Sequence, residues 1–408
     1  MRKAFISLLF ALVCGAAFAS DRTLRLDCVF TGGCAPTRIA LSSLSVTDGW
    51  YGRVVNMQKV PVEGNGRLWM TDDASGETLY ANSFSTLYQE WLTTEESKRV
   101  VRSYENTFLL PLPSGKATVH IRLFDTRRNV FCEFSCPVDP DDILLKRGAE
   151  SDVARKYVHK GKPGVDCIDV VILAEGYTAA ERGKFYRDAR AAADAILSTE
   201  PFSRFGDRFN FLAVAPASED SGVSVPRKDE WKRTPASSMF DTFYIERYLT
   251  TGAMFAVHDI LSGLPYEHII ILANTEGYGG GGIYNAYTLT TAHHRMFKPV
   301  VVHEFGHSFG ALADEYSTDS YDDPYYFSDV EPWERNITTK VDFDGKWKYM
   351  IDSGVPGVGL FEGAGYQSKG VWRPSEDCRM RTNTAEGFCP VCREAVRRMI
   401  LFNLFEEN

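Results

Sequence analysis

Hydrophobic and polar residues alternate in short runs over the first third of the chain, and turns containing glycine separate these runs. A period of two places successive side chains on opposite faces of a strand, so each run predicts a half-buried β-strand. The regular spacing of strands and turns is typical of a small β-sandwich, which we expect over residues 20–145. The predicted strands are Thr23–Phe30, Arg67–Thr71, Thr107–Leu112 and Ala117–Phe124.

The pattern changes near residue 145, after a stretch rich in charged and turn-forming residues. Cys167–Ala174 is apolar almost throughout, as in a strand buried on both faces. Thr178 and Glu181 have the spacing of a capping box, which predicts a helix directly after them. Phe209–Ala215 predicts a second buried strand. Strand, helix and strand in this order indicate an α/β domain, which we place at residues 146–408.

Three further elements follow from the same kind of pattern. We expect a helix over Thr242–Leu249, a buried strand over His268–Asn274 and a last helix from about Val391 to Phe405. The predicted fold is therefore mixed α/β, with an N-terminal β-sandwich followed by a larger α/β domain.

A helix beginning near Pro299 carries the clearest chemical signal, because His303, Glu304 and His307 spell H-E-x-x-H. One helical turn separates the two histidines, so both imidazoles can bind one metal ion. Glu304 then lies where it can take a proton from a metal-bound water. Two imidazoles favour zinc over a hard metal ion. Gly310 offers a place for the helix to end.

A catalytic zinc ion usually takes three protein ligands, and the pattern supplies only two histidines. No histidine follows His307, so a downstream ligand must be a carboxylate, either Asp314 or Glu315. We favour Asp314, whose shorter side chain suits a tight return of the chain, with Glu315 in a supporting position. His293 and His294 are alternatives that require the chain to fold back.

Glycines cluster before this helix, in the sequence YGGGGIYN at 278–285. A phosphate-binding loop is disfavoured, because no P-loop lysine or acidic partner follows at the right place. We interpret Gly280, Gly281, Gly282 and Ile283 as an edge strand whose bare backbone binds a substrate peptide as an added strand. A flexible loop is the alternative.

Residues 1–19 combine a charged start, an apolar run over Phe5–Val13 and an A-x-A cleavage sequence at 17–19. This combination is typical of a secretory signal, and the apolar run is too short to span a bilayer. Cys14 would suit a lipid anchor, but a valine precedes it where a small residue is usual, so lipoprotein anchoring is the less favoured alternative. No other stretch is a transmembrane candidate. We therefore expect an exported protein that is periplasmic, on the cell surface or extracellular.

The chain contains nine cysteines, and eight remain once Cys14 is removed with the signal. An even number in an exported chain suggests disulfides. Proximity suggests Cys28–Cys34, Cys132–Cys136 and one bond among Cys378, Cys389 and Cys392. The C-P-V-C sequence at 389–392 could instead be a redox pair or half of a structural zinc site. The zinc site is incomplete in the sequence, because only Cys378 lies nearby and no histidine follows.

The formal net charge is −9 and the pI is near 5.5, and no basic face is evident. These values argue against nucleic acid as a partner. The hydrophobic content of 44% is that of a globular protein.

The segment HEFGHSFGALADEY at 303–316 resembles the immunoglobulin A peptidase family, M64. Three other segments match the same family: VVILAEGYTAAE at 170–181, YGGGGIYN at 278–285 and the block CRMR…FCPVC at 378–392. The resemblance covers roughly residues 165–400, and a β-rich N-terminal domain also accompanies such proteins. It implies a metzincin-like zinc endopeptidase.

Metzincins continue the motif as H-E-x-x-H-x-x-G-x-x-H and have a Met-turn below the metal. Gly310 matches the motif's glycine, but Ala313 stands at the third-histidine position and the carboxylate comes one residue later. Within the resemblance, Met380 is the candidate for the Met-turn. An ordinary core methionine is the alternative.

The sequence therefore predicts a secreted, two-domain zinc endopeptidase that acts on protein or peptide substrates. The family name suggests immunoglobulin as a substrate. One alternative is a catalytically silent module that binds glycan or protein at a surface, against which the intact His303, Glu304 and His307 argue. The other is a zinc amidase acting on cell-wall peptide.

Overall fold

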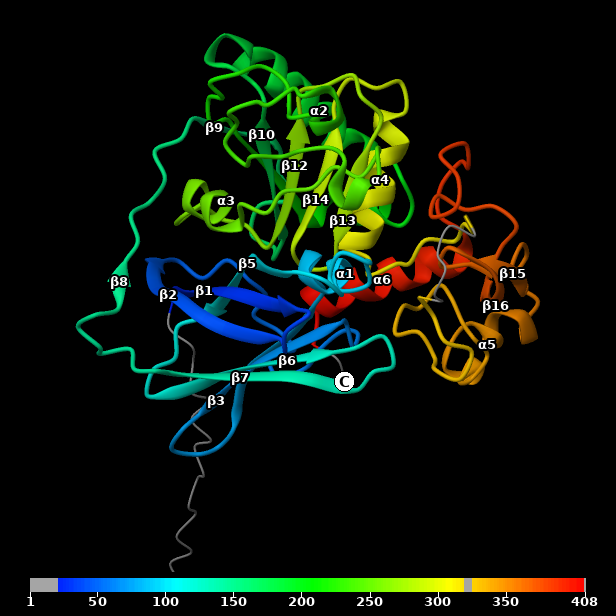
Figure 1. The fold of residues 1–408 in the computed structure, drawn as a ribbon, viewed down its shortest axis with the longest axis horizontal. Helices are drawn as coiled ribbons and strands as arrows, with labels where there is room; N and C mark the ends of the chain where they lie inside the picture. Colours follow the sequence, from blue (N-terminus) through cyan, green and yellow to red (C-terminus); the bar gives the residue numbers. More distant parts are fainter. Residues whose placement is uncertain (1–20, 319–324, 407–408) are drawn as a thin grey trace, which may run out of the picture.

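The computed structural model describes residues 21–318 and 325–406 (Figure 1). The predicted signal segment, residues 1–19, lies outside the described residues. An N-terminal β domain packs against a larger domain that has both helices and strands.

The N-terminal domain consists of two four-stranded sheets that share one apolar core. In strand Ala117–Phe124, every second side chain is buried, as the alternating pattern predicts. A short helix, α1 (Leu87–Trp91), adds the buried rings of Tyr88 and Trp91 to this core. The predicted N-terminal β domain is confirmed. In sheet order, the strands are β5 (Val101–Pro111), β1 (Arg22–Gly33), β2 (Arg38–Asp48) and β8 (Lys146–Arg147), then β4 (Thr78–Phe84), β3 (Gly66–Asp72), β6 (Ala117–Phe124) and β7 (Val130–Val138).

The second domain is built on a six-stranded sheet in which four parallel strands are flanked by an antiparallel strand at each edge. The buried strands predicted from continuous apolar runs lie inside this sheet, where both faces are covered. In order, the strands are β13 (Gly280–Ile283), β14 (Tyr287–Thr291), β12 (His268–Ala273), β10 (Ile168–Glu175), β11 (Phe209–Val214) and β9 (Arg155–His159).

Helices cover both faces of the six-stranded sheet (Figure 1). On one face, Val170 and Ile172 of β10 share a core with α2 (Arg182–Leu197) and α4 (Phe297–Ser308). On the other face, Val171 and Leu173 share a core with α3 (Met254–Ile260). Because residues alternate between faces along a strand, one strand contributes to the cores on both sides of the sheet.

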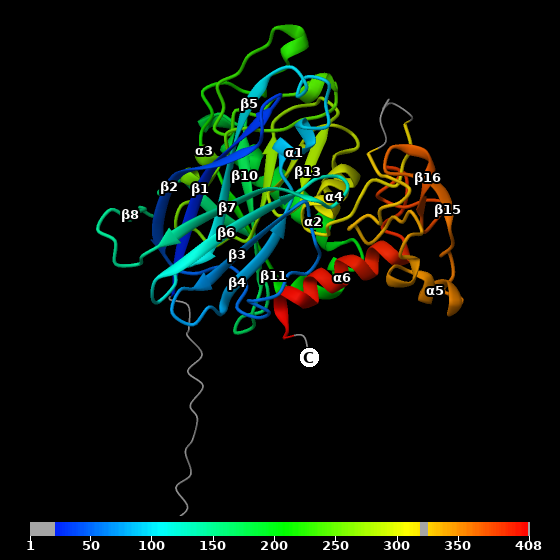
Figure 2. The same ribbon diagram turned by 60° about the horizontal axis from the view of Figure 1, so that its bottom comes forward.

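The capping box that begins the first helix is present. The backbone N–H of Thr178 donates to the Glu181 carboxylate at 2.9 Å, and α2 follows after a single 3₁₀ turn. The last helix, α6 (Pro390–Leu404), also agrees with the prediction and runs beneath the sheet toward the N-terminal domain (Figure 2).

The predicted helix over Thr242–Leu249 is wrong. Only residues 242–244 form a 3₁₀ turn, because Asp241, Phe243 and Tyr244 have positive φ values of 61°, 54° and 65°. A left-handed backbone at these positions cannot continue an α-helix. Helix α3 was not predicted from the sequence.

A smaller lobe follows α4 and packs beside it (Figure 1). It contains α5 (Lys348–Asp352) and a hairpin of β15 (Phe361–Ala364) and β16 (Gln367–Arg373). None of the helices in the described part of the chain is long and apolar enough to cross a membrane.

The two domains are joined by polar contacts as well as by the chain. Arg25 of β1 donates to Asp259 at 2.6 Å, and Asn285 donates to the carbonyl oxygen of Ser83 at 2.7 Å. Asn56 donates to the carbonyl oxygen of Phe402 on α6 at 2.8 Å. These contacts hold the N-terminal domain against α3, α6 and the segment that follows β13.

The predicted disulfides are not formed. All eight cysteines within residues 21–318 and 325–406 are free thiols. Cys132 and Cys136 both lie on β7, where four residues of extended chain separate their Cα atoms by roughly 13 Å. Cys28 lies within β1 and Cys34 follows its end, so extended chain separates this pair too. A disulfide requires Cα atoms within about 7 Å.

Candidate metal centre

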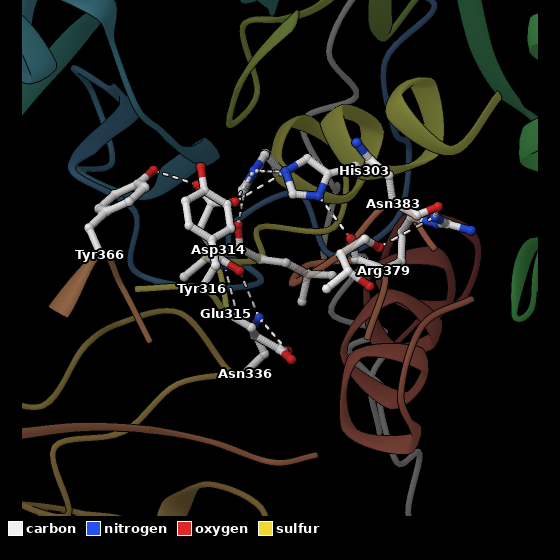
Figure 3. Close-up of polar contacts among 12 residues, drawn as sticks. His303, Asp314, Glu315, Tyr316, Asn336, Tyr366, Arg379 and Asn383 are labelled. Carbon is white, nitrogen blue, oxygen red and sulfur yellow. Dashed lines mark hydrogen bonds and ion pairs between the residues drawn. The ribbon is translucent and has the colours of Figure 1, made fainter. Parts of the chain in front are cut away.

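Helix α4 carries the H-E-x-x-H residues and packs on the edge of the sheet, against β13 and β14 (Figure 1). Figure 3 shows His303 and the residues around it. Pro299 lies in its first turn, where the missing N–H of proline costs no hydrogen bond. Val301 and Phe305 are fully buried in the core that α4 shares with α2 and α6. His303 and His307 lie on another side of the helix and are partly exposed.

The chain turns sharply after α4 and returns to the two histidines. Ala311 has a φ of 55°, and the backbone N–H of Leu312 donates to the carbonyl oxygen of Gly306 at 3.1 Å. Gly310 is required for close packing, because a Cβ there would lie 2.7 Å from the Gly306 carbonyl oxygen. This turn brings Asp314 to the imidazoles: its Oδ1 lies 3.1 Å from His303 Nε2 and 3.3 Å from His307 Nε2.

Backbone carbonyl groups determine which imidazole nitrogens face the cluster. His303 Nδ1 donates to the carbonyl oxygen of Arg379 at 2.9 Å, and His307 Nδ1 donates to that of Leu312 at 2.6 Å. Because a carbonyl oxygen only accepts, both Nδ1 atoms carry a proton. In the neutral imidazoles, both Nε2 atoms therefore present lone pairs to the centre of the cluster, as metal-binding histidines do.

Three electron-rich atoms thus converge at one point. The two Nε2 atoms are 3.0 Å apart, and Asp314 Oδ1 is buried with no hydrogen-bond donor in the described residues. Bonds of about 2.0–2.1 Å in a tetrahedral arrangement would place neighbouring ligand atoms roughly 3.3 Å apart. The observed separations fit a small metal ion held by His303, His307 and Asp314.

The pKa values of His307 and Asp314 show that the cluster favours a positive charge between these side chains. Burial opposes a charge on His307, but the Asp314 carboxylate outweighs it and raises the pKa of His307 to about 9. Burial likewise opposes the charge of Asp314, yet the two imidazoles hold the pKa of Asp314 well below its usual range. Without a metal ion, a proton supplies the positive charge at this point.

Glu304 lies beside the cluster and approaches strand β13 closely. A Cβ at Gly280 would lie 2.6 Å from Glu304 Oε1, and one at Gly282 would collide with the Glu304 carbonyl oxygen and lie 2.9 Å from the Cβ of His307. These glycines therefore let α4 pack directly on β13. Burial raises the pKa of Glu304, and the two imidazoles act against this effect.

Strand β13 is an edge strand, as predicted, but it is not open at Gly280. The N–H of Gly280 donates to the carbonyl oxygen of Arg247 at 3.3 Å, and its carbonyl oxygen accepts from the N–H of Leu249 at 3.3 Å. Beyond the other end of the strand, the carbonyl oxygen of Tyr284 accepts from the N–H of Ser85 at 2.9 Å. The interpretation of Gly280–Ile283 as a free edge therefore needs correction at Gly280, because neighbouring chain already pairs with it.

Met380 is fully buried beneath α4. A Cβ at Gly306 would lie 2.8 Å from the Met380 sulfur, so the thioether packs directly under the turn between the two histidines. The Met380 carbonyl oxygen accepts from the N–H of Glu315 at 2.8 Å. The role of Met380 as a Met-turn stays a prediction.

The alternative histidine ligands lie elsewhere. His293 Nε2 is 2.8 Å from Asp188 Oδ2, and the ring of His294 packs edge-on against Tyr278. Glu315, the other candidate for the third ligand, points away from the histidines, toward Asn336 (Figure 3).

Several residues around the cluster were not predicted. Tyr366 donates from its hydroxyl to Asp314 Oδ2 (Figure 3). Arg247 donates to the Tyr316 hydroxyl at 3.3 Å. Tyr366 is 52 residues from Asp314 and comes from the hairpin lobe, so no local pattern could reveal it. Tyr316 is part of the segment that resembles the family, which was the available signal.

Comparison with known families agrees with this arrangement. A family model described as IgA Peptidase M64 matches residues 157–357 and 352–400. A model described as Peptidase M64 N-terminus matches residues 16–135. The chain belongs to the peptidase M64 family. No curated protein is found to be similar to it. Membership makes this M64 protein a peptidase, so its substrates are proteins or peptides.

Proposed function

We propose that this M64 protein is an exported zinc endopeptidase of the metzincin type that hydrolyses peptide bonds of extracellular proteins. The observation that carries the proposal is the convergence of His303 Nε2, His307 Nε2 and Asp314 Oδ1, with Glu304 beside them. The donor set of two imidazoles and one carboxylate suits zinc. The position of Met380 under α4 supports the metzincin comparison.

Zinc held by His303, His307 and Asp314 would supply Lewis-acid chemistry, polarising a carbonyl group and lowering the pKa of water. Glu304 accepts a proton from the attacking water and passes it to the leaving amine. The raised pKa of Glu304 brings it closer to neutral pH, which suits a group that both accepts and donates a proton.

Arg247 and Tyr316 lie near Asp314 and provide hydrogen-bond donors for the substrate. Such donors stabilise the negative charge that develops on the carbonyl oxygen. Their place beside the ligand cluster supports this role.

Export is supported by the secretory pattern of residues 1–19. Immunoglobulin as a substrate rests on the family's name alone. Binding of a substrate strand along the whole of β13 would require residues 247–249 to move away from Gly280.

A peptide library treated with the mature chain tests the proposal. We expect cleavage by the wild-type chain and a loss of about 10²–10⁴-fold in rate for Glu304→Ala, with unchanged zinc content. Glu77→Ala, an exposed glutamate of the N-terminal domain, is the matched control and should cleave normally. Undiminished cleavage by Glu304→Ala would refute the mechanism. Release of cell-wall peptides without cleavage of the library would favour an amidase.

A further inference from the structure

A second group of potential metal ligands lies close to the first. The sulfur atoms of Cys378, Cys389 and Cys392 and the carboxylate of Glu315 all lie within 4.8 Å of one another. All four residues are buried, with relative exposures between 0% and 5%. None of them takes part in the cluster of His303, His307 and Asp314.

The start of helix α6 arranges two of the cysteines. Cys389 is the N-cap residue, and its sulfur accepts from the backbone N–H of Cys392 at 3.5 Å. The N–H of Cys389 donates in turn to the sulfur of Cys378 at 3.2 Å. Backbone N–H groups and the positive end of a helix favour the thiolate form, which is the form that binds metals.

Glu315 supplies the fourth donor atom. The spacing of the cysteines along the sequence did not reveal it, because Glu315 lies 63 residues before Cys378. Its Oε1 accepts from Asn336 Nδ2 at 3.0 Å and lies 2.9 Å from the sulfur of Cys392. Its Oε2 is buried and has no hydrogen-bond partner among the described residues. An unpaired carboxylate oxygen in the interior is costly, so this atom points to a cation.

We propose that Cys378, Cys389, Cys392 and Glu315 bind a second metal ion, a structural zinc ion. Soft thiolates select zinc over calcium or magnesium, and four protein donors close the coordination shell as in structural sites. In a tetrahedral zinc site, sulfur atoms lie about 3.8 Å apart, which fits within the observed limit. A disulfide between two of the cysteines would leave the third thiol and Glu315 Oε2 without a metal ion to bind.

The charge around the site is partly balanced by two buried arginines. The guanidinium of Arg379 interacts with Cys378, and that of Arg373 interacts with Glu315. Both groups therefore offset the negative charge that three thiolates and a carboxylate would leave around a divalent ion.

The second ion would hold the first cluster in place. Glu315 directly follows Asp314, and Cys378 directly precedes Arg379, whose carbonyl oxygen accepts from His303. The ion would thus tie the turn after α4 to the segment below it and to α6. This inference concerns stability and positioning, and it does not depend on the proposed peptidase chemistry.

Metal analysis of the mature full-length chain tests the inference. We expect two zinc ions per wild-type chain and one in the double variant His303→Ala/His307→Ala. Loaded with cobalt(II), that double variant should show thiolate-to-cobalt charge-transfer absorption, and Cys34→Ser in the same background should leave the band unchanged. Glu315→Gln should release its second ion to a chelator at least about tenfold faster.

A second measurement uses the wild-type chain, so it remains informative even if cysteine variants fail to fold. Alkylation of the unfolded wild-type chain without reductant, in the presence of chelator, should modify Cys378, Cys389 and Cys392. A disulfide among these three, or a double variant without metal, would overturn the inference. Failure of the proposed function would instead appear as cleavage by Glu304→Ala, whatever the metal content.

Discussion

The hydroxyl of Tyr248 donates a hydrogen bond to the carboxylate of Glu90, and this contact links the N-terminal domain to the rim of the metal cluster. Glu90 lies on α1, 158 residues before Tyr248 in the sequence. The ring of Tyr248 packs against Gly281 of β13, opposite the face that contacts α4. The N-terminal domain therefore supports the strand on which the H-E-x-x-H helix rests.

Glu90→Ala should lower the free energy of unfolding by about 1–3 kcal/mol, because it leaves the partly buried Tyr248 hydroxyl without this acceptor. Glu90→Gln keeps an acceptor and should lose less. Urea denaturation of Glu90→Ala, of Tyr248→Phe and of the double variant measures the coupling between the two side chains. Strictly additive losses would contradict a direct interaction.

Tyr366→Phe should weaken zinc binding at the histidine cluster by about 10–100-fold, because the hydroxyl of Tyr366 orients Asp314. Competition with a chromogenic chelator measures the affinity. The matched control is Tyr244→Phe, whose side chain is 85% exposed. Equal zinc affinities for the two variants would show that the hydrogen bond from Tyr366 to Asp314 does not contribute to zinc binding.

Gly282→Ala should destabilise the protein by about 1–3 kcal/mol and reduce peptidase activity, because the new methyl group would push β13 away from α4. Gly252→Ala is the control, since a Cβ at Gly252 meets nothing within 4 Å. Thermal unfolding and a peptide cleavage assay compare the two. A Gly282→Ala protein as stable as the control would contradict the close packing.

The imidazole of His258 should make stability depend on pH. Burial, with the nearby charge of Arg25, lowers the pKa of His258 to about 3, and its Nδ1 lies 2.8 Å from the Tyr266 hydroxyl. Below its ordinary pKa of 6.5, the unfolded chain binds a proton that the folded chain does not, so stability falls as the pH decreases.

The expected loss from this histidine is about 2 kcal/mol between pH 7.5 and pH 5. His258→Gln cannot titrate, so its unfolding free energy should fall less over the same range. Subtracting the two profiles removes the contributions of the other groups. Parallel profiles for the wild-type chain and His258→Gln would rule out this source of pH dependence.

Local patterns were sufficient for elements whose stability depends on nearby residues. The alternation in Ala117–Phe124, the apolar run before Glu175 and the capping box at Thr178 each predicted an element that the structure contains. Helix Thr242–Leu249 was predicted wrongly, because left-handed residues near its start leave no mark in hydrophobic periodicity.

The amino-acid sequence alone predicts the pair of imidazoles on one helical turn, the glutamate between them and the carboxylates that follow. Spacing along a helix is a local property, so the primary structure suffices. Tertiary packing, in contrast, determines that Asp314 faces the histidines while Glu315 faces three cysteines. It also determines that residues 247–249 pair with Gly280. These outcomes depend on how segments far apart in the chain pack together, and local residue spacing carries no information about such contacts.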